Sequence, residues 1–300
     1  MNITGRTTLV GVFGYPVQHT LSPQMHNAAF EHLGLDWCYL PFSVAPDNLE
    51  QALRALPALG IVGVNVTIPL KERALRAVDE VVPPANLVGA INTIHCRDGK
   101  LMGYNTDVEG FTRSLTERGE DPTGRTVLVL GAGGAARAAV VALAQMGAAR
   151  VWVAARRLAQ GARAAELARQ AAPGAQGAAI VWEDAPLHSA VAAADAVVNA
   201  TPIGMHPDVD APAPIPEGWL RPEMLIYDMV YTPAVTRLLA AARERGCRAV
   251  GGLRMLVLQG AAAFTAWTGR AAPDEVMERA LRQALEGSSP CRDHENQVWS

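Results

Sequence analysis

The sequence predicts an α/β fold made of two domains, and three observations lead to this class. The first is an apolar run at 125–130, which passes through a glycine-rich turn at 131–134 into an alanine-rich helix that ends at Gly147. The second is a repeated alternation of short apolar runs with amphipathic segments, which is typical of strands and helices packed in layers. The third is the length of 300 residues, half of them hydrophobic, which suits two domains with cores of their own.

The glycine-rich turn has the spacing of a dinucleotide-binding unit. In Gly131-Ala-Gly-Gly-Ala-Ala-Arg137, Gly131 allows a tight turn, Gly133 lets the backbone approach a pyrophosphate, and Ala136 fills the small third position of the fingerprint. The free N–H groups at the start of the helix suit phosphates. The alternative is that this segment is an ordinary glycine-rich turn between a strand and a helix, with no bound nucleotide. The expected cofactor-binding loop consists of Gly131, Ala132, Gly133, Gly134 and Ala135.

The next strand indicates which dinucleotide is bound. Residues 150–155 read as a strand that ends in Arg156 and Arg157, where an NAD-binding unit usually carries an acid for the ribose 2′-OH. Two guanidinium groups suit a 2′-phosphate instead. We therefore expect NADP (NADPH) as the cofactor, held by Ala155, Arg156 and Arg157. The alternative is that both arginines begin the next helix on a solvated face.

Composition and charge exclude several classes of protein. The net charge is −3 and the chain has no run of basic residues, so the sequence gives no sign of a surface that binds nucleic acid. The four cysteines (Cys38, Cys96, Cys247 and Cys291) are scattered without ligand spacing, so no metal site or disulfide framework is expected. We see no signal peptide and no apolar run of membrane-spanning length. The expectation is a soluble, cytoplasmic protein without a membrane partner.

The lysine content singles out one candidate acid. Of the 26 basic residues, two are lysines, Lys71 and Lys100, in a chain that otherwise uses arginine. Lysine can give up a proton where arginine cannot. Lys100 follows the turn signal Asp98-Gly99 and is expected to be exposed. Lys71 follows Pro69 in the first turn of an expected helix, where the helix dipole disfavours a cation and so favours a proton donor.

The segment before Lys71 and the first helix carry further polar candidates. Asn65 and Thr67 alternate along the strand expected at 60–68, so their side chains point the same way. Ser22 followed by Pro23 predicts a helix with Ser22 as its N-cap. Thr20 and Ser22 then either only cap this helix or bind a carboxylate at its start. His19 and His26 lack a partner at ligand spacing and are expected to be structural.

A second helix start supplies a carboxylate. Thr106 and Glu109 have the spacing of a capping box, which would put Asp107 at the first helical position, where it should stay ionised. The alternative is that Asp107 merely complements the helix dipole. The helix is expected to continue to Gly119 and to join the two domains.

The remaining elements complete the expected architecture. Other strands are expected at 9–13, 37–42, 90–96, 101–104, 178–182, 195–199 and 225–230, and other helices at 48–56, 158–172, 234–245, 253–267 and 273–286. The loop 199–205 follows a strand end, where ligands bind in open α/β sheets, and the proline-rich 207–222 is an exposed connection. We expect a substrate-binding domain at 1–107, a Rossmann-type NADP-binding domain at 108–250, C-terminal helices at 251–286 that pack back on the first domain, and a flexible tail at 287–300.

These motifs together resemble the shikimate dehydrogenase family over nearly the whole chain. Six matching segments follow in the family's order: Gly14-x-Pro16-x-x-His19-Thr20-x-Ser22-Pro23-x-x-His26-Asn27, Asn65-Val-Thr67-Ile-Pro69-x-Lys71, Asn105-Thr106-Asp107, Asn199-Ala-Thr-Pro-x-Gly-Met205, Tyr227-Asp228 and Met255-Leu-Val-x-Gln259-Gly260. The resemblance implies reversible NADPH-dependent reduction of the C3 ketone of 3-dehydroshikimate to shikimate, in aromatic amino-acid biosynthesis.

The resemblance also implies a role for each site residue. Lys71 and Asp107 would be the catalytic acid–base dyad. Thr20 and Ser22 would bind the substrate carboxylate. The ring hydroxyls would be bound by Asn65, Thr67, Asn92 and Gln259, with Tyr231 nearby. Besides the glycine loop and the arginines, the cofactor would contact Thr201, Met205, Val230 and Gly252.

Three departures from the family pattern keep alternatives open. Thr20 stands where the family usually has serine, Arg254 replaces the small residue usual before Met255 and would put charge near the nicotinamide, and the segment 155–157 retains only the central arginine of the usual clasp. The alternatives are a quinate/shikimate or aminoshikimate dehydrogenase with relaxed substrate or NAD use, and a non-catalytic metabolite sensor. Besides the small-molecule substrate, a second copy of the chain in a homodimer is the partner that we consider.

Overall fold

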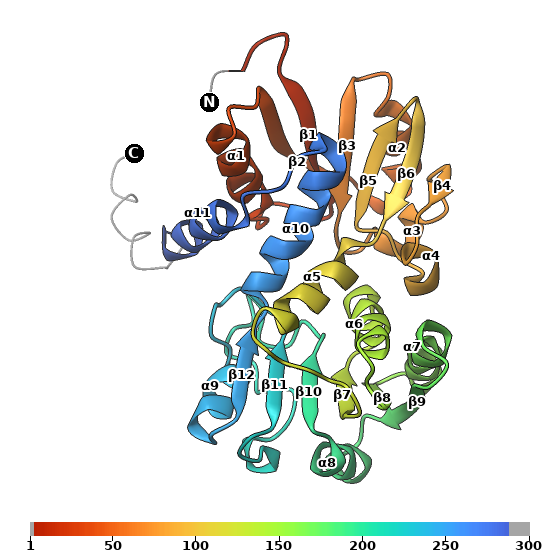
Figure 1. Ribbon diagram of the computed structural model, residues 1–300, viewed down its shortest axis with the longest axis vertical. Coiled ribbons are helices and arrows are strands. Elements are labelled where there is room, and N and C mark those ends of the chain that lie inside the picture. The colour runs from red at the N-terminus through yellow and green to blue at the C-terminus, as the bar shows by residue number, and fades with distance from the viewer. Residues whose placement is uncertain (1–2, 288–300) are drawn as a thin grey trace, which may run out of the picture.

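A computed structural model describes residues 3–287 and shows two six-stranded sheets, one in each half of the molecule (Figure 1). The part of the expected tail at 288–300 lies outside the described residues. Helices α5 (Thr106–Thr116) and α10 (Leu253–Thr268) run between the two sheets. The two-domain α/β class expected from the sequence is confirmed.

The N-terminal sheet is mixed, with strand order β2-β1-β3-β5-β6-β4. β1 pairs in parallel with β2 and β3, so their carboxyl ends meet at one edge, while β5 and β6 form an antiparallel hairpin. The strands are β1 (Thr8–Gly14), β2 (Trp37–Ser43), β3 (Ile61–Val66), β4 (Glu80–Val81), β5 (Thr93–Arg97) and β6 (Lys100–Tyr104). The helices of this half are α1 (Ser22–His32), α2 (Leu49–Ala55), α3 (Lys71–Ala74) and α4 (Ala85–Val88).

The C-terminal sheet is parallel throughout, with strand order β12-β11-β10-β7-β8-β9. The chain changes direction between β7 and β10, and ligands of such sheets bind outside the carboxyl ends of the strands at this point. The strands are β7 (Thr126–Leu130), β8 (Arg150–Ala155), β9 (Gln176–Val181), β10 (Ala196–Asn199), β11 (Leu225–Asp228) and β12 (Arg248–Gly251). The helices are α6 (Gly134–Gln145), α7 (Leu158–Ala171), α8 (Asp184–Ala193) and α9 (Arg237–Glu244).

Hydrophobic cores cover both faces of the C-terminal sheet because the side chains of β7 alternate between them. Val127 and Val129 belong to a buried cluster with the alanines of α6 and α7. Leu128 and Leu130 belong to a second cluster with α8 and α9. Apolar residues on every strand position are what a sheet buried on both faces requires.

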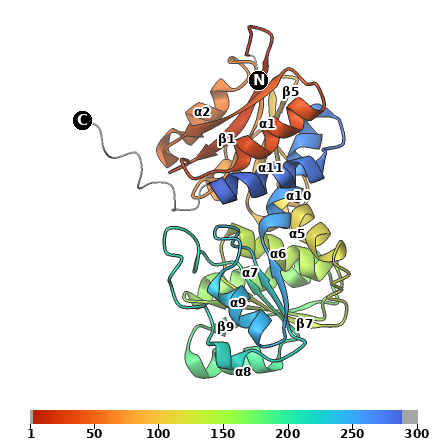
Figure 2. The same cartoon turned by 90° about the vertical axis from the view of Figure 1, so that its left-hand side faces the viewer.

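The last two helices return to the N-terminal half. α10 crosses α5 closely at Gly110, where an added Cβ would lie 2.8 Å from Cβ of Gln259 and 2.9 Å from the carbonyl oxygen of Met255. α11 (Asp274–Gly287) then packs beside α1 (Figure 2), through Met277 and Leu281 in the cluster that includes Phe30. The expected return of the C-terminal helices is therefore confirmed.

Two helix caps differ from the sequence expectation. α1 begins at Ser22 itself, with Leu21 as N-cap and no side-chain cap bond. α5 begins at Thr106 with Asn105 as N-cap, whose side chain accepts from the Val108 N–H, so the expected capping box is wrong. Asp107 is accordingly the second helical residue. A neighbouring asparagine can cap as well as threonine, which leaves the Thr106 hydroxyl free for tertiary bonds.

Several short elements were not predicted from the sequence. These are β4, α4, α8 and β12, each of ten residues or fewer. α9 begins three residues later than expected, because Thr236 is its N-cap. No helix within residues 3–287 is long and apolar enough to cross a membrane.

Candidate active site

Lys71 and Asp107, 36 positions apart, form an ion pair between the first residue of α3 and the start of α5. Lys71 Nζ and Asp107 Oδ2 lie 2.6 Å apart, and their side chains are 19% and 7% exposed. An ammonium that keeps some access to solvent and is oriented by a nearly buried carboxylate can deliver a proton to a bound molecule.

The pair lies at the boundary between the two halves of the molecule. A Cβ built on Gly134, the first residue of α6, would lie 3.7 Å from Lys71 Cδ and 3.7 Å from the Ala90 Cβ. Lys71 thus belongs to the N-terminal half while its side chain lies close to the glycine loop of the C-terminal half. The expected acid and the expected phosphate-binding loop are therefore neighbours.

Asn92 connects the pair to the polar groups around it. Its side chain is buried, and its Nδ2 donates to Asp107 Oδ1 at 2.9 Å, to Thr106 Oγ1 at 3.0 Å and to Gln259 Oε1 at 3.3 Å. Its Oδ1 accepts from the Thr106 N–H at 2.7 Å. The start of α5, α10 and the segment before β5 are thereby held in one network around Asp107.

Tyr39, which the sequence analysis missed, extends this network. Its buried hydroxyl donates to Asn65 Oδ1 at 2.7 Å. Asn65 Nδ2 in turn donates to Thr93 Oγ1 at 3.0 Å. Burial raises the pKa of the Tyr39 phenol, so the hydroxyl stays protonated as a donor. No sequence motif marked Tyr39, because it stands in an ordinary strand 26 positions from Asn65.

The expected carboxylate-binding residues lie at the carboxyl edge of β1 and β3. The hydroxyls of Thr20 and Ser22 are 3.3 Å apart and partly buried. Thr67 lies beside the carboxyl end of β1, because a Cβ built on Gly14, the last residue of β1, would lie 2.6 Å from Thr67 Cγ2. The structure thus brings Thr20, Ser22, Thr67, Asn65, Asn92 and Gln259 to the same edge of the N-terminal sheet.

The glycine loop has the conformation that its sequence predicts. Gly131 has φ +106°, and an added Cβ would lie 3.1 Å from the Ala200 carbonyl oxygen, so the turn favours glycine. Gly133 is the N-cap of α6 without a side-chain cap bond, and a Cβ there would meet open space. The first N–H groups of α6 are available to an anion, which fits a pyrophosphate.

The arginines expected to clasp a 2′-phosphate lie at the end of the neighbouring strand. β8 lies next to β7, and the Gly131 N–H donates to the Ala154 carbonyl at 2.8 Å. Arg156 and Arg157 follow directly and are exposed, and neither forms an ion pair within residues 3–287. Their position beside the glycine turn fits the phosphate of NADP.

Asp228 anchors the loops that follow β10 and β11. This buried carboxylate accepts from Asn199 Nδ2 at 2.9 Å, from the Val230 N–H at 3.0 Å and from Thr236 Oγ1 at 2.6 Å. Asn199 Oδ1 accepts from Thr201 Oγ1 at 2.6 Å. Burial raises the pKa of Asp228, and the three donors oppose that shift. The network fixes the places of the expected cofactor residues Thr201 and Val230.

Three other expected residues lie around these loops. The Met205 N–H donates to the Pro202 carbonyl at 3.0 Å, which closes the turn after β10. Gly252 directly precedes α10, where an added Cβ would collide with the Met229 backbone. Tyr231 packs against the hydrophobic cluster of α1, α10 and α11, and burial raises its pKa.

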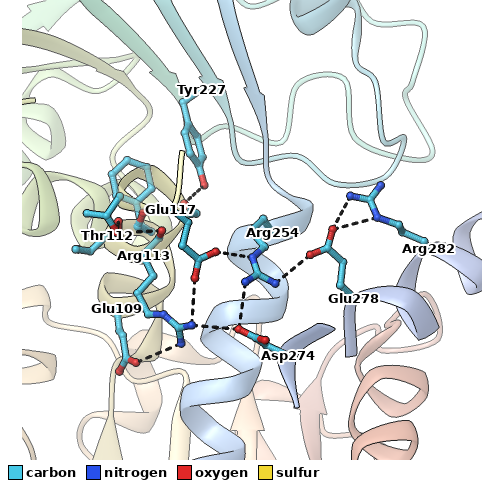
Figure 3. Close-up of polar contacts among 12 residues, drawn as sticks. Glu109, Thr112, Arg113, Glu117, Tyr227, Arg254, Asp274, Glu278 and Arg282 are labelled. Atoms are coloured by element: carbon cyan, nitrogen blue, oxygen red, sulfur yellow. Dashed lines mark hydrogen bonds and ion pairs between the residues drawn. The ribbon is translucent and has the colours of Figure 1, made fainter. Parts of the chain in front are cut away.

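Arg254 does not have the position expected from the sequence. Its side chain turns to α5 and α11 and pairs with Glu117 at 2.7 Å, Glu278 at 3.0 Å and Asp274 at 3.1 Å (Figure 3). Arg113 joins the same network through Glu117 and Asp274. The carboxylates of two neighbouring helices draw the guanidinium there, so Arg254 links helices and its charge is already paired.

The histidines and cysteines within residues 3–287 form no metal-binding group. His26 is fully buried and stacks on Tyr39 with ring centroids 4.4 Å apart, as a structural residue would. His19 is exposed and its ring lies 5.3 Å from that of His206, a partner that the sequence could not reveal. Cys38, Cys96 and Cys247 are free. In the described part of the chain no group of three or more His, Cys, Asp or Glu side chains could hold a metal ion.

A parallel dinucleotide-binding sheet, an open glycine loop and an adjoining lysine–aspartate pair define the class of two-domain, dinucleotide-dependent oxidoreductases. Comparison with known proteins gives the family. Residues 12–94 match the model of the shikimate dehydrogenase substrate binding domain, and residues 252–282 match that of the shikimate 5'-dehydrogenase C-terminal domain. A shikimate dehydrogenase (NADP(+)) of Moorella thermoacetica is 50% identical over 96% of this chain and 97% of its own. The chain belongs to the shikimate dehydrogenase family.

Solved structures agree with this family. A shikimate dehydrogenase crystallised with NADP+ superposes with a TM-score of 0.88 at 36% identity, over 95% of this chain and 98% of that one. A quinate dehydrogenase from Corynebacterium glutamicum, crystallised with NAD, gives a TM-score of 0.85 at 30% identity, over 92% of this chain and 99% of that one.

Proposed function

We propose that this chain catalyses the reversible NADP-dependent reduction of 3-dehydroshikimate to shikimate, the activity named for its 50% identical relative. The observation that carries the proposal is the Lys71–Asp107 pair, 2.6 Å apart, with the Lys71 side chain close to the glycine loop. A proton donor beside the place where a dinucleotide binds is what carbonyl reduction requires.

The roles of the residues follow from their chemistry. Bound NADPH supplies the hydride to the carbonyl carbon. The Lys71 ammonium gives its proton to the carbonyl oxygen and offsets the negative charge that develops there. Asp107 orients this ammonium and accepts a bond from a substrate hydroxyl. In the reverse direction Lys71 takes the proton back.

We propose that the polar edge of the N-terminal sheet holds the substrate. Thr20 and Ser22 bind the carboxylate through their adjacent hydroxyls. The ring hydroxyls are bound by Asn65, Thr67, Asn92 and Gln259, and Tyr231 lies at the edge of this group. The amides can each donate and accept, which suits hydroxyl groups.

The cofactor is assigned to the glycine loop and the loops beside it. The uncapped start of α6 takes the pyrophosphate, and Arg156 and Arg157 take the 2′-phosphate. The full set comprises Gly131, Ala132, Gly133, Gly134, Ala135, Ala155, Arg156, Arg157, Thr201, Met205, Val230 and Gly252. We assign substrate binding to 1–107 with 251–286, and NADP binding to 108–250. Homodimer formation and a cytoplasmic location stay predictions.

A quinate dehydrogenase is the second candidate. It is favoured by Thr20, which stands where the family usually has serine, and by the fit to a quinate dehydrogenase structure that contains NAD. The two exposed arginines at the end of β8 favour NADP, and therefore the first candidate.

A substrate and cofactor panel separates the candidates. Shikimate and quinate are each oxidised with NADP+ and with NAD+, and kcat/KM is measured from nicotinamide absorbance. We expect the highest kcat/KM for shikimate with NADP+. Higher kcat/KM for quinate with NAD+ would favour the second candidate, and no turnover of either would leave a metabolite-binding protein.

A further inference from the structure

An ion pair next to Lys71 crosses from one half of the molecule to the other. Glu72, the second residue of α3, places Oε1 2.7 Å from Nη2 of Arg137 on α6. Glu72 follows the proposed acid directly, and Arg137 lies one turn into the helix whose start faces the cofactor. This pair therefore connects the two elements that have to be aligned for hydride and proton transfer.

Arg137 is mostly buried in this position. Its side chain is 19% exposed, and its Nε and Nη2 atoms are buried without a hydrogen-bond partner within residues 3–287. Nη1 lies under Gly89, where an added Cβ would be 3.6 Å away. Glu72 is the one carboxylate paired with Arg137 within residues 3–287. The contact is therefore a charge–charge attraction between a mostly buried guanidinium and its one counter-charge.

Lys71 lies directly beside this contact. α3 has four residues, and its first carbonyl accepts from the Ile91 N–H at 2.9 Å. The flexible lysine side chain runs close to Gly134, where a built Cβ would lie 3.7 Å from Lys71 Cδ. If α3 shifts relative to α6, the ammonium moves away from the cofactor while Asp107, on α5, stays in place.

We propose that Arg137 and Glu72 are positioning residues for the reaction, which fix α3 against α6 and so set the distance from the Lys71 ammonium to the reacting carbonyl. This inference rests on the proposed function. Geometry of this kind acts on the chemical step, since small displacements of a reacting group change rates strongly.

The chain offers a matched control on the same helix. Arg73, next to Glu72, pairs with Asp47 at 2.9 Å, but both side chains are exposed and both residues belong to the N-terminal half. Arg73→Gln removes an ion pair from α3 without touching the boundary between the halves.

The test compares Glu72→Gln, Arg137→Met, their double variant and Arg73→Gln in the full chain, with shikimate and NADP+ at saturation. We expect kcat to fall about tenfold in each of the first two, with the KM for shikimate little changed. The double variant should lose no more activity than either single variant, because each single substitution removes the same contact.

Two further variants serve as controls. Arg73→Gln should keep the wild-type kcat, and Arg137→Lys should recover part of the activity that Arg137→Met loses. The melting temperature of Glu72→Gln should change little, since the Glu72 side chain is 64% exposed.

A second measurement uses the ligand-free chain. Hydrogen exchange of the amides at 71–89 should be faster in Glu72→Gln than in wild type and unchanged in Arg73→Gln. Wild-type kcat in Glu72→Gln, or additive losses in the double variant, would overturn the inference. If the unaltered chain does not oxidise shikimate with NADP+, the proposed function fails instead, and hydrogen exchange still reports whether the pair fixes α3.

Discussion

Lys71 shows how a residue type and its neighbours together determine chemistry. The chain contains two lysines, and the other one, Lys100, is exposed and pairs with Glu80 at 2.9 Å. Lys71 instead meets a nearly buried carboxylate at the boundary between the halves. The scarcity of lysine indicated the residue from sequence, but the orientation of its ammonium depends on Asn92, which holds the other oxygen of Asp107.

His26 leads to a prediction about pH and stability. Burial lowers its pKa to about 3, so the folded chain keeps it neutral while the unfolded chain protonates it below about pH 6.5. The contribution of neutral His26 to the free energy of unfolding is fully present above about pH 6.5 and is lost as the pH falls toward about 3. Between about pH 7 and pH 5 the free energy of unfolding should fall by about 2 kcal/mol from this group.

The variant His26→Phe keeps an aromatic ring beside Tyr39 and removes the titration. Urea unfolding at several pH values should show a shallower loss of stability for this variant than for wild type. His32→Phe, at the exposed end of α1, serves as the control and should keep the wild-type slope. Equal slopes for wild type and His26→Phe would show that His26 does not contribute to acid sensitivity.

At the scale of elements, turns and helix starts determine where the polar groups lie. The strand, glycine loop and helix at 126–145 could be predicted because glycine and alanine are required at given positions. The cap of α5 could not, since Asn105 and Thr106 are both good caps and the choice depends on Asn92, which binds Thr106. The prediction for Arg254 was wrong because its partners lie on two neighbouring helices, α5 and α11, and no spacing in the sequence marks them.

Asp228 leads to a prediction for the loops after β10 and β11. Asp228→Ala leaves the donors of Asn199, Val230 and Thr236 without their acceptor in a buried place. We expect a loss of about 2–4 kcal/mol in the free energy of unfolding and weaker NADPH binding, measured by urea unfolding and by fluorescence titration. Asp210→Ala, which removes an exposed pair with Arg237, should change neither. Wild-type stability in Asp228→Ala would rule out an anchoring role.

For the whole molecule, the two sheets and the connecting helices bring distant segments to one boundary. The class of fold and the two halves were predictable from the alternation of strands and helices and from the chain length. Contacts across the boundary were not, because pairs such as Glu72 with Arg137 and His19 with His206 have no spacing in sequence that marks them. Tyr39 was missed likewise, since its bond to Asn65 joins β2 to β3, which lie on either side of β1.

The central claim is that the Lys71–Asp107 pair transfers the proton in the reduction. The most direct test is kcat for shikimate oxidation by Lys71→Ala and Lys71→Arg at saturating NADP+, with KM measured in parallel. The alanine side chain has no acidic proton, and the arginine side chain does not release its proton at neutral pH. We therefore expect kcat to fall about 10²- to 10⁴-fold in both variants, with KM little changed. A kcat within about twofold of wild type in Lys71→Ala would contradict the claim.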